Sequence, residues 1–231
     1  GQNSINHAII KNAYIGLQVE ELPFENPPDN IFGNLSLKNT IINNCSGYGL
    51  LAALYNIQAE NLVITDCGNY NVLLQSAGNF NFNHCTFANF YDNSFRETPS
   101  FFVKNSVVNA LGTQILGETI LNMTNSIIYG DKSKEFLTEI INNGSLDINL
   151  NTCILKTDEN TSDTLAYKNI IKNPVSNIFK DIEMGEYELT ETSEARDKGN
   201  LNFANSVPLD ILEMSRIADS KPDLGAYEYY P

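Results

Sequence analysis

A short frame repeats along the sequence, and it limits the fold more than any other feature. In this frame two apolar residues at alternate positions precede an Asn or a substitute, and a small or polar residue and two apolar residues follow. Steps of 32, 22, 23, 21, 20 and 27 residues separate the repeats, most of them typical of one coil of a solenoid. The Asn position of the frame is occupied by His7, Asn39, Asn61, His84, Asn105, Asn125 and Thr152.

Apolar residues alternate within the frame with a period of two, which indicates strands rather than helices. A leucine-rich repeat needs a helical half and a propeller blade needs about 40 residues, so neither fits. We therefore predict an all-β, right-handed parallel β-helix of about seven recognisable coils. Its interior should include the column four residues before the Asn position, which reads Leu35, Ile57, Phe80, Phe101, Leu121 and Ile148.

The frame also predicts the domain organisation. Residues 1–172 are expected to form the coils, with loop insertions at 20–34, 91–99, 130–146 and 157–172. Residues 173–231 lack the frame and are expected to form a C-terminal cap packed on the same solenoid, where they would cover apolar interior at one end.

The Asn column has a structural interpretation, because stacked amides can hydrogen-bond to each other and to the turn backbone. Both histidines, His7 and His84, occupy this column. We expect them to be structural rather than catalytic or metal-binding, and a ligand site along the column is the alternative.

Cysteines and tyrosines follow the same frame. The four cysteines have no C-x-x-C spacing and are expected to be buried free thiols, with a strained Cys45–Cys67 disulfide as the alternative. Tyr48 and Tyr70 lie nine residues after successive Asn positions. They are expected either to stack on each other or to form an exposed platform for a sugar ring.

The chain carries 28 acidic and 14 basic residues, which gives a formal net charge of −14. This charge disfavours nucleic acid and anionic membrane surfaces as partners, and no apolar run is long enough to predict a membrane span. With only three arginines, the chain has few groups for binding the carboxylates or sulfates of a polyanion. A neutral glycan, a cation or a protein is therefore the kind of partner we expect, with a polysaccharide or cell-surface glycan as the leading candidate.

Two loops contain the candidate binding residues outside the coils. The 20–34 loop is rich in acids and prolines and includes Phe24 and Glu25, which we regard as binding candidates. Calcium could bind its acids, but no D-x-D-x-D-G spacing supports this, so we predict no metal and no cofactor. Tyr91 opens the second loop, 91–99, which is a candidate groove wall.

Catalysis would require paired carboxylates on neighbouring coils. Asp66 and Asp92 are the best pair in the sequence, with Arg96 as a substrate clamp, although a turn-forming role for Asp66 is simpler. The Arg clusters of pectate-lyase-like enzymes are absent. A polysaccharide lyase or glycoside hydrolase is therefore the alternative to a non-catalytic binding module, and a structural spacer is a third hypothesis.

The tail contains a second recognisable pattern. Its elements are Gly185-Glu186-Tyr187-Glu188-Leu189, Ser193-Glu194-Ala195-Arg196-Asp197-Lys198-Gly199, Asp210, Arg216 and Asp223-Leu224-Gly225-Ala226-Tyr227-Glu228. This series resembles the C-terminal segment of right-handed parallel β-helix surface proteins of Bacteroidetes-type bacteria, which belong to the pectate-lyase-like superfold. Glu213 departs from that pattern, which usually has Gly there. The resemblance implies export and display at the outer cell surface, and the biochemical roles of such proteins are mostly unassigned or linked to polysaccharides.

Overall fold

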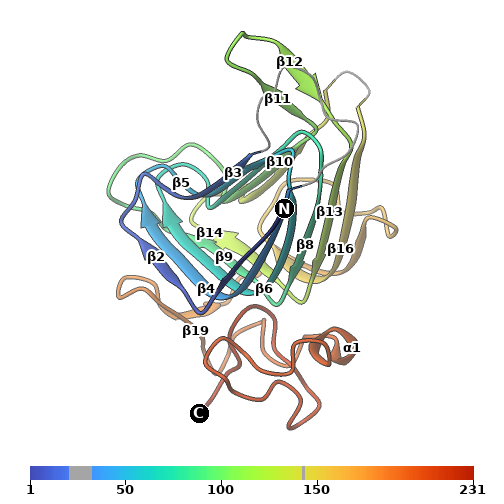
Figure 1. The fold of residues 1–231 in the computed structure, drawn as a ribbon. Helices are drawn as coiled ribbons and strands as arrows, with labels where there is room; N and C mark the ends of the chain where they lie inside the picture. The colour runs from blue at the N-terminus through green and yellow to red at the C-terminus, as the bar shows by residue number, and fades with distance from the viewer. Residues whose placement is uncertain (21–32, 142–143) are drawn as a thin grey trace.

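The computed structural model describes residues 1–20, 33–141 and 144–231, and its regular structure is predominantly β (Figure 1). A ten-stranded sheet, called sheet A, and a five-stranded sheet, called sheet B, contain only parallel pairings. Sheet A contains β1 (Gln2–Asn6), β2 (Ile9–Lys11), β4 (Asn34–Cys45), β6 (Asn56–Cys67), β8 (Gly78–Asn83), β9 (Thr86–Asn89), β13 (Thr119–Thr124), β14 (Ile127–Gly130), β16 (Leu146–Leu155) and β17 (Tyr167–Lys172). Sheet B contains β3 (Ile15–Glu20), β5 (Tyr48–Ala53), β7 (Val72–Gln75), β10 (Phe101–Lys104) and β15 (Phe136–Glu139).

The chain visits the two sheets in turn. It runs along a first segment of sheet A, bends into a second segment of the same sheet, crosses to sheet B and returns to the next first segment. Each strand pairs in register with its equivalent one turn later, for example Asn34 with Asn56. This all-β arrangement of parallel sheets is compatible with the predicted β-helix.

The bend in sheet A lies at the predicted Asn column. Asn39, Asn61 and Asn125 have φ values of 47°, 50° and 45°, and His84 has 52°. This left-handed conformation is unfavourable for most residues, but Asn tolerates it, which explains the repeated Asn better than stacking alone. The amides also stack as predicted, because Asn61 Nδ2 donates to Asn39 Oδ1 at 2.9 Å.

One repeat was assigned to the wrong sheet. Asn105 does not lie in the bend of sheet A, because the strand before it, β10, pairs with β7 and β15 of sheet B. Phe101 is accordingly opposite Val72, whereas the other residues of the predicted apolar column are in register in sheet A. The prediction failed because an inward-facing strand of sheet B has the same alternation. Asn169 in β17, with a φ of 53°, follows Thr152 in the column instead.

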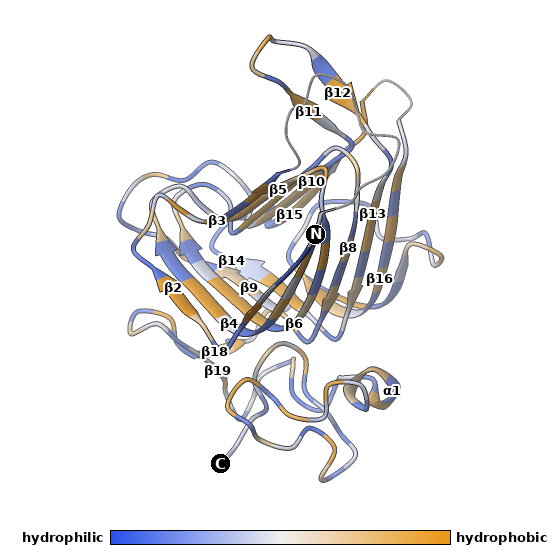
Figure 2. Cartoon of the chain, in the orientation of Figure 1, coloured by the Kyte–Doolittle hydropathy of each residue, from blue (hydrophilic) through white to orange (hydrophobic). Residues whose placement is uncertain are grey.

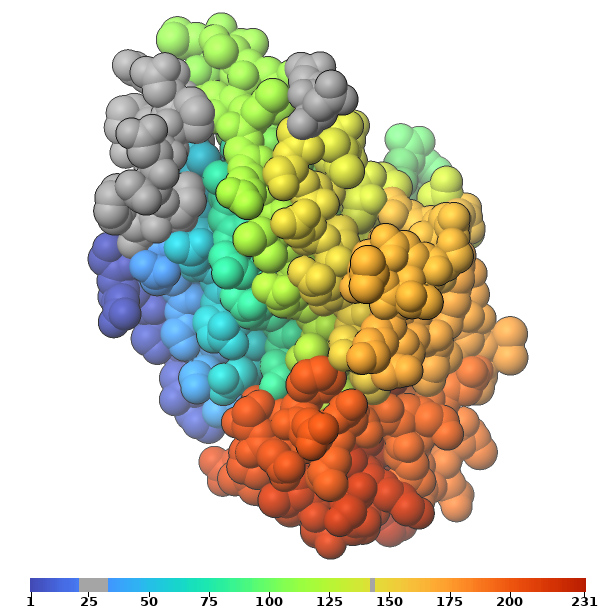
Figure 3. Space-filling model, turned by 90° about the vertical axis from the view of Figure 1, so that its right-hand side faces the viewer, coloured from blue at the N-terminus to red at the C-terminus, as the bar shows by residue number. Residues whose placement is uncertain are grey.

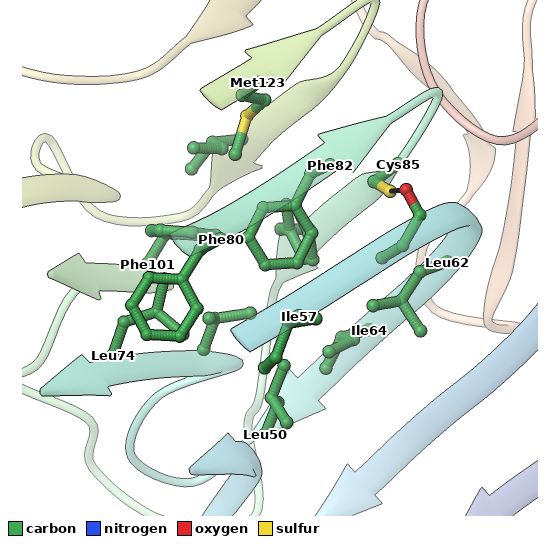
Figure 4. Packing of buried hydrophobic residues seen from close by; sticks show 14 of the residues in the cluster. Leu50, Ile57, Leu62, Ile64, Leu74, Phe80, Phe82, Cys85, Phe101 and Met123 are labelled. Carbon is green, nitrogen blue, oxygen red and sulfur yellow. Dashed lines mark hydrogen bonds between the residues drawn. The ribbon is translucent and has the colours of Figure 1, made fainter. Parts of the chain in front are cut away.

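Apolar residues recur along the strands of both sheets (Figure 2), and most of the buried ones form one core between the sheets. Aromatic rings fill its centre, where Phe82 and Phe101 meet edge to face with centroids 5.7 Å apart (Figure 4). All four cysteines are free and buried, as predicted, and all four lie in this core with no exposed surface. The alternation of each strand therefore places one side chain in the core and the next on the outer surface.

The predicted loops are only partly loops. Residues 91–99 form no strand or helix, but residues 130–146 include β15 and residues 157–172 include β17. Most of the 20–34 loop, at residues 21–32, lies outside the described residues. A projecting antiparallel hairpin of β11 (Ser106–Val108) and β12 (Gln114–Leu116) follows β10 and was not predicted.

The tail after β17 lies along the side of the stacked strands rather than across one end (Figure 3). It contains a hairpin of β18 (Phe179–Asp181) and β19 (Glu186–Leu189) and a short helix, α1 (Leu201–Ala204). Its apolar side chains cover the outer face of the second segments of sheet A. The residues covered on that face are Ile41, Val63, Ala88, Ile127, Ile154 and Ile171.

Candidate functional site

A groove crosses the outer face of the first segments of sheet A and has a volume of about 700 Å³. We call it the amide groove, because its outward-facing side chains are amides and hydroxyls from four neighbouring strands, β1, β4, β6 and β8. Those outward-facing residues are Gln2, Ser4, Asn34, Ser36, Asn56, Gln58, Asn79 and Asn81.

Strand alternation creates the groove. Leu35 and Ile57 point into the core with exposed fractions of 3% and 1%, so their neighbours Asn34, Ser36 and Gln58 face outward. Because the strands pair in register, Ser36 lies beside Gln58, and Gln58 lies beside Asn81. The result is a set of polar columns in which successive side chains lie about 4.8 Å apart along the stack.

Hydrogen bonds between the amides hold several of these side chains in place. Asn56 Nδ2 donates to Asn34 Oδ1 at 3.2 Å, and Asn81 Nδ2 donates to Asn79 Oδ1 at 2.9 Å. Asn122 on β13 continues the set by donating to Asn81 Oδ1 at 3.0 Å. An amide has two donor hydrogens and two acceptor lone pairs, so Asn81 keeps one of each for a ligand beyond these bonds.

No charged side chain lines the amide groove among the described residues. The nearest charged residues along β4 and β6, Lys38 and Glu60, form an ion pair with an N–O distance of 2.8 Å. The groove can therefore offer many neutral donors and acceptors but little electrostatic attraction for an ion.

The predicted catalytic residue Asp66 is engaged with the tail. It has a φ of 53° and follows Asn44, with a φ of 53°, in a second bend, which is the predicted turn-forming role. Its Oδ1 accepts hydrogen bonds from Tyr187 Oη at 2.5 Å and Phe90 N at 3.2 Å. Burial raises the pKa of Asp66, and the negative charge of nearby Asp92 contributes to the rise.

The structure places the other two predicted catalytic residues in different surroundings. Asp92 is exposed. The Arg96 side chain is only 1% exposed, and it binds both carboxylate oxygens of Glu135 at 2.8 Å. It also donates to Asn89 O at 2.9 Å, and Glu135 accepts from Ser100 N at 2.7 Å. Arg96 thus ties the 91–99 loop to the segment that precedes β15, and these bonds occupy the guanidinium that was predicted to act as a substrate clamp.

The predicted tyrosines stack on each other. The rings of Tyr48 and Tyr70 lie 5.9 Å apart at 18°, and Phe102 extends the stack at 5.8 Å from Tyr70. Tyr14 meets Tyr48 edge to face at 6.3 Å. Phe102 and Tyr14 were not singled out from the sequence, although in-register strands bring such residues together.

None of the predicted binding tyrosines lines the amide groove. Tyr91 is partly buried, and its ring lies against Gly68, at whose position a Cβ atom would come within 3.1 Å of Tyr91 Cε1. Phe24 and Glu25 lie outside the described residues.

Both histidines and the Asn column have structural partners. Fully buried His84 has its Nε2 2.9 Å from Asn125 Nδ2 and its Nδ1 3.3 Å from Gly225 O of the tail. Its pKa is well below the usual value because of burial and nearby Arg216. His7 Nε2 lies 3.2 Å from Asn39 Nδ2. These contacts confirm the structural interpretation of the column.

The recognised tail motif is also structural. Arg216 Nη1 pairs with Glu228 at 2.6 Å, and Arg216 Nη2 donates to Asn61 Oδ1 at 2.9 Å. Asp210 and Asp223 accept backbone N–H bonds from within the tail, including 2.6 Å from Tyr229 N to Asp223 Oδ2. The motif therefore ties the tail to the Asn column. Its charged groups are engaged within the protein, which leaves them few hydrogen bonds for a ligand.

We did not predict the amide groove from the sequence, although the polar residues that form it recur in the same repeat. Asn34, Gln58 and Asn81 occupy the outward positions of the same strands whose inward positions defined the repeat. A column of polar residues alone is typical of a solvated face, so only the volume of the groove distinguishes it.

Within residues 1–20, 33–141 and 144–231, no group of three or more His, Cys, Asp or Glu side chains is placed to hold a metal ion. The same residues contain no helix long and apolar enough to cross a membrane. Neither a protein family nor a curated protein matches this chain.

Proposed function

We propose that this chain is a right-handed parallel β-helix module that is displayed outside the cell and binds a neutral glycan in the amide groove without cleaving it. The parallel stacking of both sheets supports this fold. The resemblance of the tail to β-helix surface proteins supports the location.

The uncharged, amide-lined groove is the observation that carries the proposal. Sugar hydroxyls both donate and accept hydrogen bonds, and amide side chains such as Gln58 and Asn81 can satisfy both roles. The volume of about 700 Å³ lies within the range of small-molecule sites and suits a short stretch of glycan.

The negative charge of the protein favours neutral glycans over acidic ones. A uronic acid polymer would meet a protein of net charge −14 at a groove without a lining cation among the described residues. A neutral glycan avoids this repulsion, and its binding should depend little on salt.

The surroundings of Asp66 favour binding over catalysis. Its carboxylate accepts hydrogen bonds from Tyr187 and Phe90, and it does not line the amide groove. A substrate would have to compete with Tyr187 and Phe90 for the Oδ1 atom of this partly buried group. Polysaccharide cleavage is the alternative function, and the same experiment tests it.

The test is titration calorimetry with neutral oligosaccharides of mannose, glucose and xylose, and with oligogalacturonate. We expect a neutral oligosaccharide to bind, and we expect the Gln58→Ala/Asn81→Ala variant to weaken binding at least about tenfold, because each lost amide removes hydrogen bonds. Asn149→Ala is the matched control, because Asn149 is an exposed amide on β16 outside this groove. Its affinity should equal that of the wild type.

Several results would contradict the proposal. Failure of all neutral oligosaccharides to bind favours a structural spacer, and equal affinity of the double variant places the site elsewhere. Appearance of new reducing ends or unsaturated products, abolished by Asp66→Asn or Asp92→Asn, identifies an enzyme.

A further inference from the structure

The tail contains a second cavity, of about 580 Å³, far along the chain from the amide groove. We call it the tail pocket. It lies between the β18–β19 hairpin, the turn at residues 211–214 and the C-terminal residues 228–230. Its lining residues are Lys180, Glu188, Leu189, Thr190, Glu191, Leu212, Met214, Glu228, Tyr229 and Tyr230.

The tail pocket gathers large apolar side chains that are exposed to solvent. Leu212 is 55% exposed, Met214 36% and Tyr230 48%. Single exposed apolar residues are ordinary, but several around one cavity are typical of a binding surface. Met and Tyr suit such a surface, because a thioether adapts to different shapes and a phenol ring offers a large rigid face.

The charges of the tail pocket are predominantly negative. Its one lysine, Lys180, is paired with Glu186 at 2.8 Å, and Glu228 is paired with Arg216 at 2.6 Å. Glu188 and Glu191 form no ion pair within the described part of the chain. Two carboxylates at the edge of the pocket therefore lie outside ion-pair distance of the described cations, and the charge of Lys180 attracts only Glu188 of the two, from further away.

The protein shows how a cation contacts one of these rings. The Arg196 guanidinium lies over the Tyr229 ring at 4.4 Å from its centroid. Cations bind the faces of aromatic rings by this geometry, and carboxylates nearby add to the attraction.

We propose that the tail pocket docks a peptide segment of a partner protein that presents a Lys or Arg side chain beside apolar ones. The methylene stem of the basic side chain and its apolar neighbours pack on Leu212, Met214 and Tyr230. The cationic end reaches Glu188 and Glu191. The proposal is independent of glycan binding, because the two cavities share no lining residue.

The test uses three fluorescein-labelled peptides of equal length, with the repeats Leu-Lys, Ser-Lys and Leu-Glu, and measures fluorescence polarisation with the full chain. We expect the Leu-Lys peptide to bind at least about tenfold more tightly than either of the others, because only it matches both apolar and charged features. The Ser-Lys peptide measures non-specific attraction to a chain of net charge −14.

Variants locate the site. Glu188→Gln/Glu191→Gln and, separately, Leu212→Ser should each weaken Leu-Lys binding at least about fivefold. Glu183→Gln is the control, because Glu183 is an exposed tail carboxylate outside this pocket, and it should bind as the wild type does. Circular dichroism of each variant confirms folding. Equal binding of the Leu-Lys and Ser-Lys peptides, no binding of Leu-Lys, or equal losses in the double variant and the control would overturn the proposal.

Discussion

The two segments of sheet A, before and after the bend, are alike in their apolar inward side chains but differ in the polarity of their outward ones. Before the bend, the outer face consists largely of amides such as Gln58 and Asn81, and it remains open as the amide groove. After the bend, the outer face consists of Val63, Ile127 and other apolar residues, and the tail covers it. The inward pattern therefore specifies the stack, and the outward pattern decides which face the tail covers.

Among the predicted effects on stability, the largest should come from loss of Arg216, which anchors the tail over the covered face. Arg216→Met leaves Glu228 without its buried partner and removes the bond to Asn61. We expect a loss of about 3–5 kcal/mol in the free energy of unfolding, measured by urea denaturation. Arg196→Met is the matched control, because Arg196 is partly exposed and its loss should cost under about 1 kcal/mol. Similar effects of the two substitutions would show that the tail is not anchored at the Asn column.

Two isoleucines of one coil compare the covered and open faces directly. Ile120 and Ile127 both face outward, on either side of Asn125, but only Ile127 lies under the tail, with no exposed surface. We expect Ile127→Ala to reduce the free energy of unfolding by about 3 kcal/mol and Ile120→Ala by about 1 kcal/mol. Thermal and urea denaturation measure both values, and equal losses would contradict the assignment of the covered face.

Acid should weaken the covered face through His84. Because burial keeps the pKa of His84 well below its ordinary value of 6.5, the unfolded chain binds a proton that the folded chain does not. The contribution of His84 to stability is therefore lost as the pH falls below about 6.5, by about 1 kcal/mol between pH 7 and pH 5.5, whereas Glu228, whose pKa burial raises to about 7, contributes in the opposite direction. His84→Asn should reduce this loss, whereas His7→Asn, at an exposed position of the same column, should retain it. A loss unchanged in His84→Asn would assign the pH dependence to other groups.

The smallest effect on stability is expected at the open face. Asn81→Ala removes a partly exposed side chain, so the free energy of unfolding should change by less than about 0.5 kcal/mol. Its effect should appear in glycan affinity instead. A large loss of stability would mean that the amides of the groove hold the sheet together rather than serve a ligand.

Much of the fold could be predicted because its causes are local. A bend that needs a positive φ selects Asn at Asn39, Asn61 and Asn125, and alternation gives the core. The same alternation gave a wrong prediction for Asn105, which follows a strand of sheet B. That strand is also apolar on its inner face, so it resembles a strand of sheet A. Local pattern alone does not report which sheet a strand joins.

The candidate site was harder to predict because its causes are not local. Arg96 binds Glu135, which is 39 positions away in the sequence, and Asp66 accepts a hydrogen bond from Tyr187, which is 121 positions away. Contacts with such distant partners give these charged residues a structural role. The sequence near Arg96 or Asp66 contains no signal that predicts these partners. The amide groove needs four strands in register before it exists, so only the pairing reveals it.

Hydrogen–deuterium exchange with and without a saturating neutral oligosaccharide tests the central claim most directly. The expected result is slower exchange in the first segments of β4, β6 and β8, with unchanged exchange in the tail at residues 173–231. Protection confined to the tail, or no protection in either face of sheet A, would contradict the assignment of the open amide face as the binding surface.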